Sequence, residues 1–137
     1  MKASKLLRGF FILLMAAAGL GKLADMPGFY PIVASYQLLP DLLVVPSAWA
    51  LMLSEVSLAA WLVWGRALWL AGLALIAMHV FYLLGLTQAL LRGLTLDNCG
   101  CFGVYFSRPL TWFSPLEDVC LLALAVLFWI QARRAPA

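Results

Sequence analysis

Four long apolar stretches, separated by short polar segments, constrain the fold of this chain more than any other feature. They cover about residues 6–22, 46–64, 67–91 and 115–132. A helix needs roughly 17–25 apolar residues to cross the hydrocarbon core of a bilayer. Only 11% of the residues are charged, whereas soluble domains average about 25%. The sequence therefore predicts one all-α membrane domain over residues 1–137, built as a transmembrane four-helix bundle in a lipid bilayer.

Basic and acidic residues separate between the two ends of these stretches. The basic residues at one end are Lys2, Lys5, Arg8, Arg66, Arg133 and Arg134. The other end holds every acidic residue except Glu55, namely Asp25, Asp41, Asp97, Glu117 and Asp118, and only three basic residues, Lys22, Arg92 and Arg108. Cytoplasmic segments are enriched in Lys and Arg. We therefore predict a multi-pass protein of the bacterial inner membrane, with cytoplasmic N and C termini and outward-facing loops at residues 23–45 and 92–114.

The chain ends and loops carry three further signals. The basic residues before the first apolar stretch are also typical of a signal peptide, whose cleavage would leave three spans. Pro31 predicts the start of a short surface helix over residues 31–39. Ser114, Pro115 and Glu117 match a capping box at the start of the last span. The basic residues are scattered rather than clustered, so the net charge of +3 does not indicate a nucleic-acid partner.

A pair of cysteines in the second outer loop carries the clearest chemical signal. Two thiols separated by one glycine, Cys99 and Cys101, can form a disulfide if the backbone turns, and glycine favours such a turn. A ring this small is strained, and strained disulfides are the labile, oxidising ones. An exposed loop gives a partner thiol access, and Arg92 or Arg108 would favour a thiolate if it lies close. The pair therefore predicts thiol–disulfide redox chemistry.

Two other interpretations of the cysteine pair remain. A static disulfide would close a three-residue ring, which stabilises a fold little because it constrains little chain. Two or three thiolates also bind soft ions such as Cu(I) or Zn²⁺. No histidine lies near the pair and the spacing of a four-ligand zinc site is absent, so we assign no metal ligands.

Two ionisable residues, Glu55 and His79, lie deep within the apolar stretches. At about 1.5 Å per residue from the turn at Arg66, they reach similar depths on neighbouring antiparallel helices. We expect them to hydrogen-bond to each other, with Lys22 as a further candidate partner for Glu55. Such residues act as packing pairs, as proton relays or as partners of a quinone carbonyl. Cys120, about one turn into the last span, is either a small buried hydrophobe or a resolving thiol for the pair.

Several motifs occur in the order found in one known family. They are Gly19-Leu20-Gly21-Lys22, Leu38-Leu39-Pro40, Glu55, Asn98-Cys99-Gly100-Cys101-Phe102-Gly103 and Glu117-Asp118. Over about residues 7–127 the chain resembles the MauE/DoxX-type four-helix membrane proteins. The resemblance implies a four-helix bundle that works with a periplasmic thioredoxin-like partner. MauE-type members are linked to maturation of methylamine dehydrogenase, whose small subunit is rich in disulfides, and DoxX-like relatives include a subunit of a thiosulfate:quinone oxidoreductase.

These observations together favour a membrane thiol–disulfide redox protein, a candidate oxidoreductase. It would support periplasmic disulfide formation or electron transfer with a thioredoxin-like partner or a client protein, and quinone is a candidate electron acceptor. The sequence carries no fused thioredoxin-like domain, so we expect a separate partner protein. The alternatives are a non-enzymatic membrane subunit that anchors a larger complex and a carrier of soft Cu or Zn ions.

Overall fold

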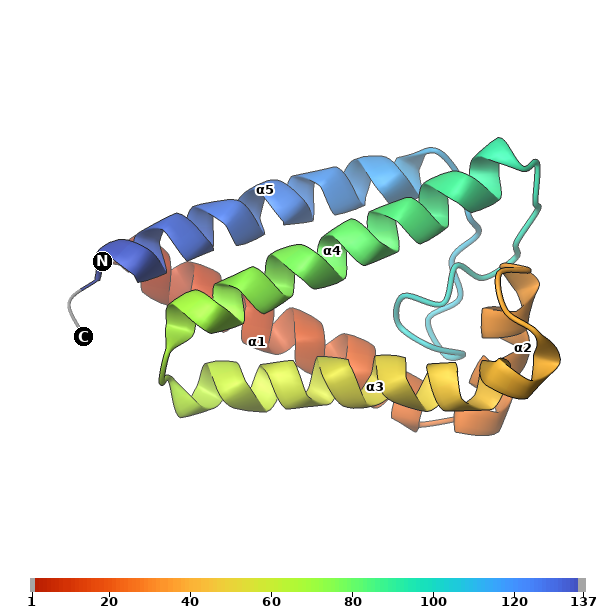
Figure 1. The fold of residues 1–137 in the computed structure, drawn as a ribbon, viewed down its shortest axis with the longest axis horizontal. Helices are drawn as coiled ribbons and strands as arrows, with labels where there is room; N and C mark the ends of the chain where they lie inside the picture. The colour runs from red at the N-terminus through yellow and green to blue at the C-terminus, as the bar shows by residue number, and fades with distance from the viewer. Residues whose placement is uncertain (1, 136–137) are drawn as a thin grey trace.

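The computed structural model describes residues 2–135, and all of its regular secondary structure in that range is helical (Figure 1). The long helices are α1 (Lys2–Leu23), α3 (Asp41–Trp64), α4 (Leu68–Leu91) and α5 (Phe113–Arg134), and α2 (Met26–Ser35) is short. All four long helices are long and apolar enough to cross a membrane. The predicted all-α architecture with four spans is therefore confirmed.

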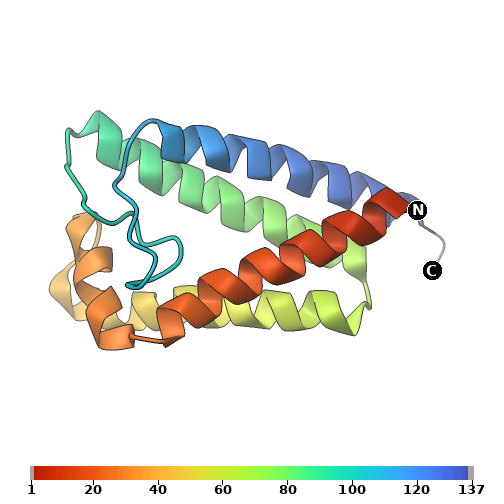
Figure 2. The ribbon, with the colours of Figure 1, turned by 180° about the vertical axis from the view of Figure 1, so that it is seen from behind.

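The helices are arranged so that the two ends of the bundle differ. The start of α1, the end of α5 and the turn between α3 and α4 lie at one end, whereas α2 and the loop between α4 and α5 lie at the other (Figure 1). α4 runs along α5, and α1 crosses the bundle obliquely against α3 (Figure 2). The basic residues of the termini and of the α3–α4 turn thus share one end, which we call the basic end.

The orientation of the basic end in the membrane stays a prediction. A periplasm-active reporter such as alkaline phosphatase should be active when inserted in the loop near Asp97 and inactive when fused to the C-terminus, because positive charge is retained in the cytoplasm. A fusion between Gly65 and Arg66 serves as the cytoplasmic control. An active C-terminal fusion together with an inactive loop fusion would contradict this orientation.

The first outer segment differs from the prediction in where its helix begins. α2 begins at Met26, because the Asp25 side chain accepts a hydrogen bond from the Gly28 amide at 3.0 Å and Pro27 occupies the first turn. Pro31 therefore lies inside α2, and the predicted helix over residues 31–39 is wrong. α2 packs through Met26 and Phe29 on α3, which closes this end of the bundle.

The starts of α3 and α5 also differ from the sequence pattern. α3 begins at Asp41, after an extended Pro40, so that Pro46 lies within the helix rather than at its start. α5 begins at Phe113, and its cap residue Trp112 makes no side-chain capping bond. The predicted capping box is wrong, because Glu117 instead forms an ion pair with Arg108, with N–O distances of 2.6 and 3.1 Å.

An apolar core fills the bundle toward the basic end. Its largest buried side chains include Phe11, Met15, Leu62, Leu75 and Phe128. The Arg8 side chain closes this end by donating hydrogen bonds to the carbonyls of Leu62 at 2.7 Å and Val63 at 3.0 Å, which are free at the end of α3. The buried polar residues Lys22, Glu55, His79, Ser114 and Asp118 lie in the rest of the bundle.

Candidate thiol site

We call the loop between α4 and α5, residues 92–112, the cysteine loop. It folds into the open end of the bundle, and two glycines allow this backbone path. Gly103 has a φ of +81°, and a Cβ there would lie 2.3 Å from the Gly21 carbonyl oxygen on α1. Gly100 has a φ of +82°, and its Cβ would lie 2.6 Å from the Ile32 side chain on α2. A larger residue at either position would meet both backbone strain and a clash. The glycines of the Cys-Gly-Cys-Phe-Gly string thus let the loop lie against α1 and α2.

Hydrogen bonds fix the loop on both sides of the cysteines. The Asn98 side chain accepts from the Gly100 amide at 2.9 Å and donates to the Gly103 carbonyl at 3.1 Å. The Cys99 amide donates to the Arg108 carbonyl at 2.8 Å, and the Tyr36 hydroxyl donates to the Cys99 carbonyl at 2.5 Å. The backbone that carries the thiols is therefore preorganised.

The two thiols lie together, one of them buried and the other partly buried. Their Sγ atoms are 3.5 Å apart, as free thiols in hydrogen-bond contact. Cys99 is only 7% exposed, because it packs in an apolar cluster with Leu86, Leu96 and Leu110. Cys101 is partly buried. The expectation of an exposed pair is wrong, because the apolar residues of the loop fold into the bundle and the cysteines between them become buried as well.

The contact between the thiols makes them chemically unequal. A hydrogen bond from the Cys101 thiol lowers the pKa of Cys99 to about 6, against the opposing effect of burial, and the Arg108 guanidinium lowers it further. The same hydrogen bond and burial raise the pKa of Cys101. Arg92 instead donates to the carbonyls of Tyr36 and Gln37. Cys99 is thus the more acidic of the two thiols and Cys101 the less acidic.

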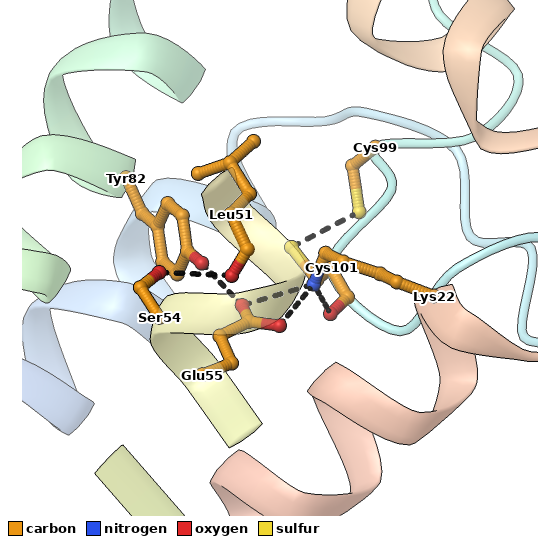
Figure 3. A network of polar contacts seen from close by, with 7 residues as sticks. All are labelled: Lys22, Leu51, Ser54, Glu55, Tyr82, Cys99 and Cys101. Carbon is orange, nitrogen blue, oxygen red and sulfur yellow. Dashed lines mark hydrogen bonds and ion pairs between the residues drawn. The ribbon is translucent and has the colours of Figure 1, made fainter. Parts of the chain in front are cut away.

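A buried ion pair lies directly behind the cysteine loop (Figure 3). The Lys22 ammonium donates to both oxygens of Glu55 at 2.9 and 2.8 Å and to the Cys101 carbonyl at 2.7 Å. The Tyr82 hydroxyl also donates to Glu55. Lys22 is 2% exposed and Glu55 is fully buried. All three ammonium hydrogens have acceptors, so the ion pair anchors the loop backbone at Cys101 to α1 and α3.

His79 pairs with Asp118 rather than with Glu55, which corrects the expected pairing of the two deep residues. Its Nδ1 lies 2.9 Å from Asp118 Oδ1. α4 packs along α5, so His79 meets the α5 carboxylate, while Lys22 takes Glu55. Sequence reasoning missed Tyr82 and Asp118. The one available signal was the three-residue spacing of His79 and Tyr82, which places both on one face of a helix.

These side chains surround a cavity of about 60 Å³. Its polar lining includes Glu55, His79, Tyr82, Cys99, Cys101 and Asp118. A cavity of this size fits a few water molecules, whereas small-molecule sites typically measure about 300–1,000 Å³, so a quinone ring would require the helices to separate.

Cys120 is exposed on α5 and does not line the cavity, so the structure does not bring it to the cysteine pair. Within residues 2–135, no three His, Cys, Asp or Glu side chains form a metal-binding group.

Comparison with known proteins gives a consistent result over nearly the whole chain. Residues 1–131 match the family model of methylamine utilisation protein MauE. The chain is 35% identical to methylamine utilization protein MauE of Paracoccus denitrificans over 120 residues, which are 88% of this chain and 64% of that protein. The same protein of Paracoccus versutus is 32% identical over the same shares, and that of Methylorubrum extorquens is 31% identical over 90% of this chain and 67% of that protein. The chain thus spans just under two thirds of the two Paracoccus proteins. No solved structure matches this chain.

Proposed function

Because this chain belongs to the MauE family and is a multi-pass bacterial membrane protein, we propose that it is a membrane thiol–disulfide oxidoreductase. In this function Cys99 and Cys101 cycle between dithiol and disulfide. The observation that carries the proposal is the pair of sulfurs 3.5 Å apart in a preorganised loop, with a lowered pKa at one thiol and a raised pKa at the other. Thiolate character at one sulfur and a resolving thiol beside it are what exchange requires.

The exchange step follows from this inequality. Because Cys99 is 7% exposed, the loop first opens, and the Cys99 thiolate then attacks a disulfide of a partner protein, whose S–S bond breaks to give a mixed disulfide and one partner thiolate. Cys101 then loses its proton, attacks the Cys99 sulfur and displaces the second partner sulfur, which takes up that proton. Two electrons pass from the loop to the partner. In the reverse direction, the loop disulfide oxidises a partner dithiol.

The resemblance and the relatives' name support a specific setting for this chemistry. The relatives are named for methylamine utilization, so we place the exchange in the periplasmic maturation of proteins used for that purpose. The partner is a thioredoxin-like protein or a disulfide-rich client. When the loop acts as the oxidant, a membrane quinone restores its disulfide by taking two electrons from the loop and two protons, one from the Cys101 thiol and one from water, and becoming quinol. Lys22 and Glu55 hold Cys101 in place during both half-reactions.

A trapping experiment tests the proposal. In a Cys101→Ser variant the mixed disulfide at Cys99 cannot be resolved within the loop, so we expect a partner adduct that shifts on a non-reducing gel and disappears with reductant. Cys99→Ser should trap much less, because the remaining thiol has a raised pKa. Cys120→Ser should leave trapping by Cys101→Ser unchanged, since Cys120 lies outside the cavity.

Two results would overturn the redox function. The first is full biological activity of a Cys99→Ser, Cys101→Ser double variant, which would leave the protein as a non-enzymatic subunit. The second is a loop pair that stays oxidised below about −300 mV, as structural disulfides do.

A further inference from the structure

We propose that His79 and Asp118 form a proton-exchange site in the cavity, which gives and takes the proton of Cys101 through water during thiol–disulfide exchange. This inference rests on the proposed redox function. It assigns a role to Asp118, to which the sequence analysis gives no chemical function. His79 and Asp118 are positioned on α4 and α5, the two helices that form one side of the cavity.

Two unsatisfied polar atoms point to a ligand at this site. His79 is 2% exposed and Asp118 is 6% exposed. One bond joins them, between Nδ1 and Oδ1, and the remaining atoms, His79 Nε2 and Asp118 Oδ2, have no hydrogen-bond partner among the described residues. A buried polar atom without a partner is energetically unfavourable. Both residues line the cavity, and water there would satisfy both atoms.

The other titratable groups around the cavity already have hydrogen-bond or ion-pair partners. On α1, all three hydrogens of the Lys22 ammonium are donated, two of them to Glu55 on α3. Tyr82 on α4 donates to the same carboxylate. The remaining charged pair consists of Arg108 in the loop and Glu117 on α5. Among the described cavity-lining residues outside the cysteine pair, His79 Nε2 and Asp118 Oδ2 are therefore the titratable atoms left without a hydrogen-bond partner.

Such a group gives the proton of Cys101 a route during the exchange. Breaking the loop disulfide with two electrons releases Cys99 as a thiolate near neutral pH, because its pKa is about 6. Cys101 leaves as the other sulfur and needs one proton, since its pKa is raised. A protonated His79 ring gives that proton through cavity water, and Asp118 stabilises the ring while it is charged. In the reverse direction, the neutral ring accepts the proton from Cys101 before this sulfur attacks Cys99.

The experiment uses the fact that the chain contains a single histidine. The full chain, purified without a histidine tag and labelled with ¹⁵N-histidine in lipid nanodiscs, gives ring signals from His79 alone. The pH midpoint of these signals reports the proton affinity of His79. We expect this affinity to differ by at least about twofold between the reduced and the oxidised loop, because sites that share a proton are reciprocally coupled. Asp118→Asn should remove this difference, whereas Glu117→Gln, the matched control on the same helix, should retain it.

Exchange kinetics give a second measurement. His79→Gln cannot titrate, so we expect the exchange rate with a thioredoxin-like dithiol to fall roughly 10²-fold and to lose its His79-dependent pH midpoint. If the loop converts between its redox states while the His79 midpoint is the same in both, the proton-exchange site is refuted and the redox function stands. If the loop pair does not cycle at all, both proposals fail.

Discussion

Lys22→Met is expected to lower the free energy of unfolding by about 3–5 kcal/mol, the usual effect of removing one partner from a buried ion pair. The variant leaves the Glu55 carboxylate fully buried, with Tyr82 as its remaining hydrogen-bond donor. It also removes the 2.7 Å bond to the Cys101 carbonyl, so the loop loses its anchor. Reversible unfolding in mixed detergent micelles measures the change, and alkylation of Cys99 reports the release of the loop.

Two further variants separate the ion pair from a general effect of losing a lysine. Lys5→Met removes an exposed lysine from the same helix, and its effect should stay within about 0.5 kcal/mol. The double variant Lys22→Met, Glu55→Gln has no unpaired charge and keeps a partner for Tyr82, so it should regain most of the lost stability. A Lys22→Met variant as stable as Lys5→Met would contradict the buried ion pair.

The reactivity of Cys99 should have a pH midpoint of about 6, far below that of an ordinary cysteine at about 8.5. The hydrogen bond from Cys101 is the largest cause of this shift, so Cys101→Ala should raise the midpoint by at least about one pH unit. Because its pKa is lowered, Cys99 carries more thiolate below pH 8 than an ordinary cysteine does. The Cys101→Ala variant loses this excess thiolate. Alkylation of Cys99 across pH 5–9, followed by mass spectrometry, measures the midpoint.

A matched substitution at Cys101 keeps a hydrogen-bond donor but replaces its sulfur with oxygen. Cys101→Ser retains a hydroxyl that can donate to Cys99, so its midpoint should stay well below that of Cys101→Ala. Both variants are made in a Cys120→Ser background, because Cys120 is exposed and would also be alkylated. Equal midpoints for the Ala and Ser variants would show that the thiol contact does not set the reactivity of Cys99.

The membrane fold was accessible from the sequence because apolar length alone identifies a span. The pairing of the buried polar side chains was not accessible from the sequence, as His79 shows. Counting residues from a turn gives the height of a side chain along its helix, but the partner depends on which face of the helix it occupies and which helix lies opposite. Glu55 and His79 lie at similar heights by residue count, yet α1 brings Lys22 to Glu55, and α5 brings Asp118 to His79.

The cysteine loop shows a second limit of sequence reasoning. Cys99 and Cys101 were recognised from their spacing, but their burial depends on Leu96 and Leu110, whose apolar side chains fold the loop inward. The start of α2 was readable in principle from Asp25 followed by Pro27 and Gly28, a pattern typical of a helix N-terminus. Pro31 gave a competing signal, and the earlier cap determined the structure.

The ion pair between α1 and α3 also bears on the order in which the protein is made. Lys22 precedes Glu55 by 33 residues, whereas the Cys101 carbonyl follows Lys22 by 79. During synthesis, the two charges can therefore meet in the bilayer before the cysteine loop has been translated. An isolated acid at the centre of an inserting helix costs about 2.5–3.5 kcal/mol, and pairing with Lys22 offsets that cost early. The first half of the nascent chain thus carries its own charge compensation, and the redox loop later docks onto a lysine that is already in place.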